Sequence, residues 1–119
     1  MRNFRDLEIW RDSIKLVKEI YKLTDSLPEQ EKFGLKSQMN RCSISISSNI
    51  AEGCAKDSQK DFVRYLQISL GSAFELETQI EICVELNFIK RESVIAISNS
   101  LVKLEKQIKA LINYSKTQI

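Results

Sequence analysis

The sequence predicts an all-α protein built as an antiparallel, up-down four-helix bundle, on three observations. Only 3 glycines and 1 proline occur in 119 residues, too few turn-forming residues for an all-β fold. Apolar residues recur at steps of three and four in four segments, which is the period of an amphipathic helix. The connections between segments are short, which favours antiparallel neighbours. The length predicts one domain, residues 1–119.

The first predicted helix covers about residues 6–27 and carries two adjacent apolar stripes. Together they form an arc of roughly 200°, whereas a surface helix needs a stripe somewhat over about 100° wide. The excess predicts burial on two sides, one in its own bundle and one against another chain. The first stripe is Leu7, Trp10, Ile14, Val17 and Tyr21. The second stripe supplies the oligomer-interface candidates Ile9, Leu16, Ile20 and Leu23.

The second predicted helix covers about residues 29–54, after Pro28. Residues 42–47 alternate with period two, which is a strand signal, but the longer window keeps a helical stripe and favours a helix. Gly53 stands where a left-handed C-cap is expected. The stripe is Leu35, Met39, Cys42, Ile46 and Ile50.

Two further helices are predicted at about residues 58–86 and 91–114. Ser58 with Asp61 three residues later resembles a capping box, and Asn87 can adopt the left-handed turn that ends a helix. The last segment keeps a three-four alternation, the seam of a bundle helix. That seam is Val94, Ile97, Leu101, Leu104, Ile108 and Leu111.

The composition argues against catalysis. Histidine is absent, which removes the commonest general base, the commonest metal ligand and every imidazole-based triad. The three cysteines have no metal-binding spacing, and Cys42 and Cys83 lie on apolar stripes, so inert buried thiols are favoured over nucleophiles. No glycine-rich phosphate loop occurs. We therefore expect no enzyme activity, no catalytic residue, no metal and no cofactor.

The chain is expected to be cytoplasmic. Its N-terminus lacks the apolar segment of a signal peptide, and no stretch is long and apolar enough to cross a bilayer. The odd, widely spaced cysteines then indicate reduced thiols. No membrane partner is expected.

Charge is banded along the chain. Residues 65–89 carry 4 acidic and no basic groups, whereas residues 90–119 carry 6 basic and 2 acidic groups. Within the acidic band, Glu77 projects into the apolar arc of the third predicted helix, between Leu66 and Leu70. A carboxylate there needs a partner, or its pKa rises. A structural ion pair with Arg41 is the favoured interpretation. An acid or base role is the alternative, and no companion nucleophile supports it.

The basic residues are the better functional candidates. Those on the first helix share one narrow stripe: Arg11, Lys15, Lys18 and Lys22. A looser set on the last helix is Lys103, Lys106 and Lys109. They could contact phosphates of RNA or DNA. The alternative is a solvated face with intrahelical pairs such as Asp12 with Lys15, each worth only a few tenths of a kcal/mol.

Several spaced motifs then support a family resemblance. They are Phe4-Arg-Asp-Leu-Glu-Ile-Trp10, Glu31-Lys-Phe-Gly-Leu-Lys-Ser-Gln38, Arg41, Ser48-Asn-Ile-Ala-Glu-Gly53, Gly71-Ser72 and Glu75-Leu-Glu-Thr-Gln79. In this order, from Phe4 to Tyr114, the chain resembles the four-helix-bundle proteins encoded in intervening sequences of bacterial 23S rRNA genes. It is also similar to the accessory proteins of diversity-generating retroelements.

The resemblance implies an antiparallel bundle that assembles as a ring-like homopentamer, without catalytic activity, and it suggests nucleic-acid binding. Two functions are therefore carried forward. The first is a homo-oligomeric bundle that binds RNA or DNA through its basic residues. The second is an adaptor or scaffold that docks a partner protein such as a reverse transcriptase or a nuclease.

Overall fold

Four long helices make up the protein. The structure, a computed structural model, describes residues 2–119, and this range contains no strand. The helices are α1 (Glu8–Thr24), α2 (Leu35–Cys54), α3 (Gln59–Glu85) and α4 (Ile95–Lys116). Short 3₁₀ turns precede three of them: η1 (Phe4–Asp6), η2 (Glu29–Glu31) and η3 (Arg91–Ser93). The all-α prediction is confirmed, and the alternating stretch at residues 42–47 lies within helix α2.

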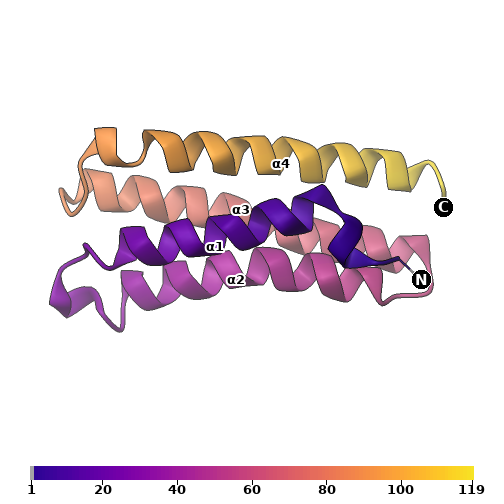
Figure 1. Cartoon of the computed structure of the whole chain (residues 1–119), viewed down its shortest axis with the longest axis horizontal. Coiled ribbons are helices and arrows are strands. Elements are labelled where there is room, and N and C mark those ends of the chain that lie inside the picture. The colour runs from indigo at the N-terminus through magenta and orange to yellow at the C-terminus, as the bar shows by residue number, and fades with distance from the viewer. Residues whose placement is uncertain (1) are drawn as a thin grey trace.

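The helices run antiparallel to their sequence neighbours, side by side, as Figure 1 shows. Each helix packs on the next one in the chain, and α4 closes the circuit by packing on α1. The molecule measures 45 × 23 × 19 Å, and both termini lie at the same end of the bundle. Every helix therefore has two flanks in grooves and one outer face, so the outer faces are available for function.

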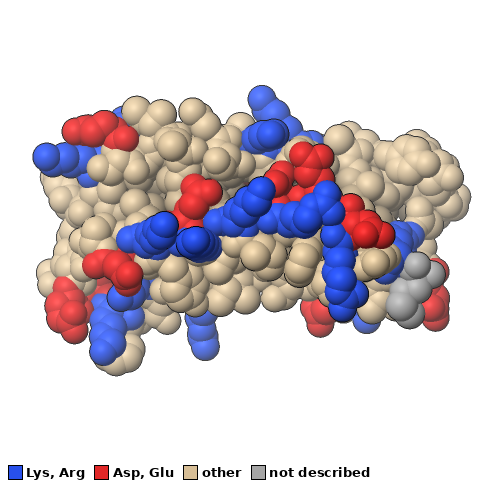
Figure 2. Space-filling model, in the orientation of Figure 1, with Lys and Arg blue, Asp and Glu red and all other residues tan. Residues whose placement is uncertain are grey.

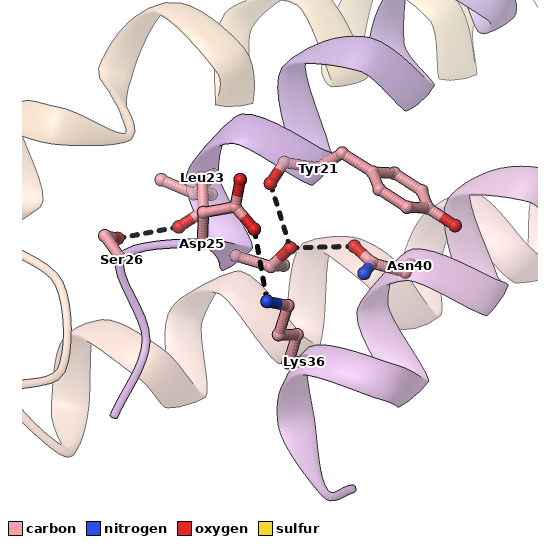
Figure 3. A network of polar contacts seen from close by, with 7 residues as sticks. Tyr21, Leu23, Asp25, Ser26, Lys36 and Asn40 are labelled. Carbon is pink, nitrogen blue, oxygen red and sulfur yellow. Dashed lines mark hydrogen bonds and ion pairs between the residues drawn. The ribbon is translucent and has the colours of Figure 1, made fainter. Parts of the chain in front are cut away.

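The first connection differs from the prediction, because α1 ends at Thr24 and α2 begins only at Leu35. Thr24 Oγ1 lies 3.2 Å from the Tyr21 carbonyl oxygen and donates to Asn40 Oδ1 of α2 at 2.8 Å, as Figure 3 shows. Gly34, with φ −105° and ψ −113°, is outside the helical region and separates η2 from α2. The polar contacts of Thr24 therefore mark the end of α1, and the non-helical backbone of Gly34 marks the start of α2.

Of the three predicted cap residues, two are confirmed and one is not. Ser58 accepts a hydrogen bond from the Asp61 amide at 3.1 Å, and Asn87 has a φ of 60°, as predicted. Gly53 is not a left-handed cap, because no glycine has a positive φ. It lies inside α2, where an added Cβ would meet Tyr65 Cβ at 2.9 Å. Close packing of α2 against α3 is therefore the reason for glycine at this position.

The core corrects the predicted oligomer interface. Ile9, Leu16 and Ile20 are buried inside the bundle, and Leu23 is half-buried against the same core. These side chains face α2 and α4 of their own chain, so the prediction that Ile9, Leu16 and Ile20 contact another chain is wrong. The outward stripe of α1 is instead the first one, in which Ile14 and Tyr21 are exposed and Trp10 and Val17 are half-buried. Periodicity finds both stripes but does not say which one faces the core.

No helix between residues 2 and 119 is long and apolar enough to cross a membrane.

Candidate nucleic-acid interface

A row of basic side chains runs along the outer face of α1. Arg11, Lys15, Lys18 and Lys22 are all exposed and follow one another at steps of three and four residues, so each lies about one helical turn from the next. We call these four residues the α1 ridge. Figure 2 shows a band of Lys and Arg side chains across the face where α1 lies in Figure 1. The helix thus lines up four positive charges over about 16 Å.

The charges of the ridge are not paired at close range. Within residues 2–119, the ion pairs shorter than 4.0 Å are Lys36–Asp25 at 3.1 Å and Arg91–Glu81 at 2.7 Å. The pair between Asp12 and Lys15, which the alternative interpretation named, is not among them. Arg11 is held in place by its own donation from Nη1 to the Arg5 carbonyl oxygen at 2.8 Å. Unpaired ammonium groups on an outer face remain available for phosphate oxygens.

The groove between α1 and α4 joins the two basic sets. Lys15 of α1 and Lys103 of α4 line one hollow of about 140 Å³, together with Asp12 and Glu19. The Gln107 side chain also lines this hollow, and its Oε1 is enclosed without a hydrogen-bond donor. The groove is therefore polar and of mixed charge, with the ridge along its outer edge.

The three lysines of α4 do not form one ridge. Lys103 and Lys106 line a shallow depression on α4. Lys109 is six residues beyond Lys103, which places it about 120° further around the helix, on the flank away from α1. Lys103 therefore lies next to the α1 residues, Lys106 lies beside it on the outer face of α4, and Lys109 lies apart from both.

The predicted ion pair between Glu77 and Arg41 is wrong. Arg41 lines a hollow of about 330 Å³ between α2 and α3, and the α3 carboxylate in that hollow is Glu75. Glu77 follows two residues later, so it lies about 200° around α3 from Glu75. It faces the groove with α4, where it lines a second hollow beside Arg91. Sequence spacing alone could not say which flank of α3 meets α2.

This region also contains a buried carboxyl group that was not predicted from the sequence. Glu105 of α4 is only 8% exposed, and its Oε2 has no hydrogen-bond partner. Burial and the neighbouring Glu77 raise the pKa of Glu105 to about 8. Its place four residues after Leu101 and seven before Ile112, both buried, was the available signal.

The comparisons with known proteins bear on these features. The family model described as 23S rRNA-intervening sequence protein matches residues 5–110. The chain belongs to the 23S rRNA-intervening sequence protein family. No curated protein matches this family member.

A solved structure resembles this chain over most of its length. It is the crystal structure of a protein with unknown function from the S23 ribosomal protein family, from Bacteroides thetaiotaomicron VPI-5482. The two chains share 30% sequence identity, with a TM-score of 0.81, and the match covers 87% of this chain and 97% of the other. Neither this description nor that of the family names a catalytic activity.

The thiols of this 23S rRNA-intervening sequence protein are poorly placed for nucleophilic chemistry. Cys42, Cys54 and Cys83 are buried. Burial and then the Glu75 carboxylate raise the pKa of Cys42 to about 12, and burial also raises the pKa of Cys54 and Cys83. A thiol must ionise to act as a nucleophile or a metal ligand, so these groups stay unreactive near neutral pH. Residues 2–119 also contain no cluster of three potential metal ligands.

Proposed function

We propose that this protein is a non-enzymatic, homo-oligomeric helical bundle that binds RNA or DNA through the α1 ridge, supported by Lys103 and Lys106. The observation that carries the proposal is the row of exposed basic side chains on one outer face, none of them in a close ion pair. The family description, which refers to an intervening sequence of 23S rRNA, is consistent with an association with RNA.

The test is a titration of structured RNA at two salt concentrations. Binding through several phosphates releases counterions, so affinity should fall steeply as salt rises, and the four ridge residues together should account for up to about 3 of the slope of log K against log salt. Replacing Arg11, Lys15, Lys18 and Lys22 by alanine should weaken binding to all sequences alike.

A matched control removes the same number of charges elsewhere. Lys32, Lys60, Lys90 and Lys116 are exposed and lie off the ridge, and their replacement by alanine should leave most of the affinity intact. Equal losses in both variants would show that only the net charge matters. No binding of the unaltered protein at low salt would overturn the proposed function.

The homo-oligomer is proposed to form through α3. Three large apolar side chains on this helix are exposed, Ile68, Phe74 and Ile82, and so is Leu86, which caps its C-terminal end. Phe74 alone leaves 55% of its surface accessible. Apolar groups gathered on one long helix are typical of a subunit contact. A contact there would leave the α1 ridge free on each subunit, and a ring of five, as the resemblance implies, would carry five ridges.

A protein partner is the second candidate function. Phe33, between η2 and α2, is 88% exposed, more than any other large apolar side chain of residues 2–119. A lone exposed aromatic ring at the end of a bundle is suited to filling a pocket on another protein. A pull-down with tagged protein, treated with nuclease, should then recover a partner that a Phe33→Ser variant loses. A pull-down without nuclease that recovers nucleic acid and no partner protein would count against this function.

A further inference from the structure

An apolar stripe lies directly beside the α1 ridge, and of its residues only Trp10 also packs against the core. It consists of Trp10, Ile14, Val17 and Tyr21. Ile14 is 44% exposed and Tyr21 is 42% exposed, while Trp10 and Val17 are half-buried. This stripe is the surplus part of the wide apolar arc of α1. Because the stripe lies next to the ridge, a ligand bound to the ridge can also cover the stripe.

Cationic and apolar residues alternate along this edge of the helix. Arg11 and Ile14 are three residues apart, Ile14 and Lys18 four, and Lys18 and Tyr21 three. Residues at these spacings are neighbours on a helix surface, with Cβ atoms about 5–6 Å apart. A positive row and an apolar row therefore run in parallel for about 16 Å.

The other long edge of the ridge is lined by acidic rather than apolar side chains. Asp12 and Glu19 lie there and line the hollow against α4. Carboxylates repel a phosphate backbone and offer no surface for stacking. A strand whose phosphates contact the ridge would consequently turn its remaining groups toward Ile14 and Tyr21.

One of the two aromatic rings of the stripe, that of Trp10, is fixed by a contact with a neighbouring ring. Trp10 packs edge-on against Phe4, with ring centroids 5.0 Å apart. The Tyr21 ring is exposed and points away from the polar contact between Thr24 and Asn40, as Figure 3 shows. A ring that is already positioned, as that of Trp10 is, loses little conformational entropy when a ligand covers it.

We propose that α1 binds an unpaired nucleic-acid strand, with phosphates on Arg11, Lys18 and Lys22 and bases covering Tyr21, Ile14 and the edge of Trp10. The inference rests on the proposed nucleic-acid function and specifies its substrate. A basic track beside exposed aromatic rings is the arrangement that binds single strands, because every base has a face that can stack. The phosphates of a duplex would contact the ridge, but its bases are paired with one another and would leave the apolar stripe uncovered.

The single tryptophan of the chain gives a direct readout. A 12-nucleotide single-stranded RNA and a 12-base-pair RNA duplex would be titrated into the full-length protein at the same low salt concentration. The single strand should bind about tenfold tighter and quench the Trp10 fluorescence. The duplex should bind through charge alone, with little quenching.

A Tyr21→Leu variant tests the stacking role while keeping the position apolar. It should lose about fivefold to tenfold of its affinity for the single strand and none for the duplex. The matched control is Tyr114→Leu, because Tyr114 is an exposed tyrosine on α4 and belongs neither to the ridge nor to the apolar stripe. That variant should behave as the unaltered protein.

The outcomes separate the two proposals. Duplex binding as tight as single-strand binding, or an unchanged affinity of Tyr21→Leu, would overturn the single-strand inference and leave the nucleic-acid function standing. No binding of either RNA would overturn both. A lower mass of Tyr21→Ser in light scattering would show that a second copy covers the stripe, which also overturns the inference.

Discussion

At the scale of single residues, the burial of Glu105 makes the stability of the folded protein depend on pH. Its carboxyl group lies between α3 and α4, faces Glu77, and has an oxygen without a donor. A pKa of about 8 in the folded protein, against an ordinary value of 4.5, means that the folded state holds a proton that the unfolded chain releases. Stability contributed by this proton is fully present below about pH 4.5 and is lost as the pH rises to about 8.

Replacing Glu105 by glutamine should remove this dependence. The amide is neutral at every pH, so Glu105→Gln should be more stable than the unaltered protein near pH 9, by about 1–3 kcal/mol. The measurement is a series of thermal melts between pH 5 and pH 9. Glu92→Gln, at an exposed position, is the control. Parallel melting curves for the unaltered protein and Glu105→Gln across this range would contradict the expected ionisation.

Two glycines within helices should respond oppositely to alanine. At Gly53 a new Cβ would lie 2.9 Å from Tyr65 Cβ and 3.3 Å from Phe62 Cδ1, so α2 and α3 would have to separate. We expect Gly53→Ala to destabilise the fold by about 1–3 kcal/mol. At Gly71 nothing lies within 4 Å, and Gly71→Ala should stabilise by about 0.5–1 kcal/mol through helix propensity. Urea unfolding of both variants measures the difference, and a stabilised Gly53→Ala would refute the close-packing argument.

At the scale of helices, polar contacts join α2 to its neighbours on both sides. Ser69 Oγ of α3 donates to the Ile46 carbonyl oxygen at 2.8 Å in the buried interior. On the other side, Thr24 joins the end of α1 to Asn40. Beside it, the Lys36–Asp25 ion pair is partly exposed and should add little. The hydroxyl contacts are therefore the ones expected to fix how the helices are aligned.

A Thr24→Val substitution tests the α1–α2 contact. Valine keeps the shape and leaves the side-chain oxygen Oδ1 of Asn40 without its donor, which should cost about 1–2 kcal/mol. Thr117→Val is the control, since Thr117 is an exposed hydroxyl that bonds locally to the Tyr114 carbonyl oxygen. Denaturant unfolding reports both, and equal stability of the two variants would show that the buried hydroxyl contributes nothing.

At the scale of the whole molecule, function depends on which faces remain exposed. The bundle buries one stripe of every helix, and three of the surfaces that stay exposed bear on function. They are a basic and apolar surface on α1, an acidic and apolar surface on α3, and a groove of mixed charge between α1 and α4. Our proposals assign nucleic acid to the first surface and a second copy of the chain to the second.

Light scattering tests the proposed self-association. The unaltered protein should have a mass several times 13.8 kDa. A variant with Phe74→Ser and Ile82→Ser should dissociate toward that value, because both exposed side chains lie on α3. Ile95→Ser, at an exposed position on α4, should keep the higher mass. A monomer at all concentrations would contradict the oligomer proposal.

The sequence by itself determined the number and approximate extent of the helices, the caps at Ser58 and Asn87, and the basic row on α1. These features depend on local spacing, which periodicity reports directly. Only the tertiary structure decided that Ile9, Leu16 and Ile20 face inward, that Arg41 lies across from Glu75 rather than Glu77, and that Glu105 is buried. Which flank of a helix meets which neighbour depends on rotation about the helix axis, and packing of the whole bundle sets that rotation.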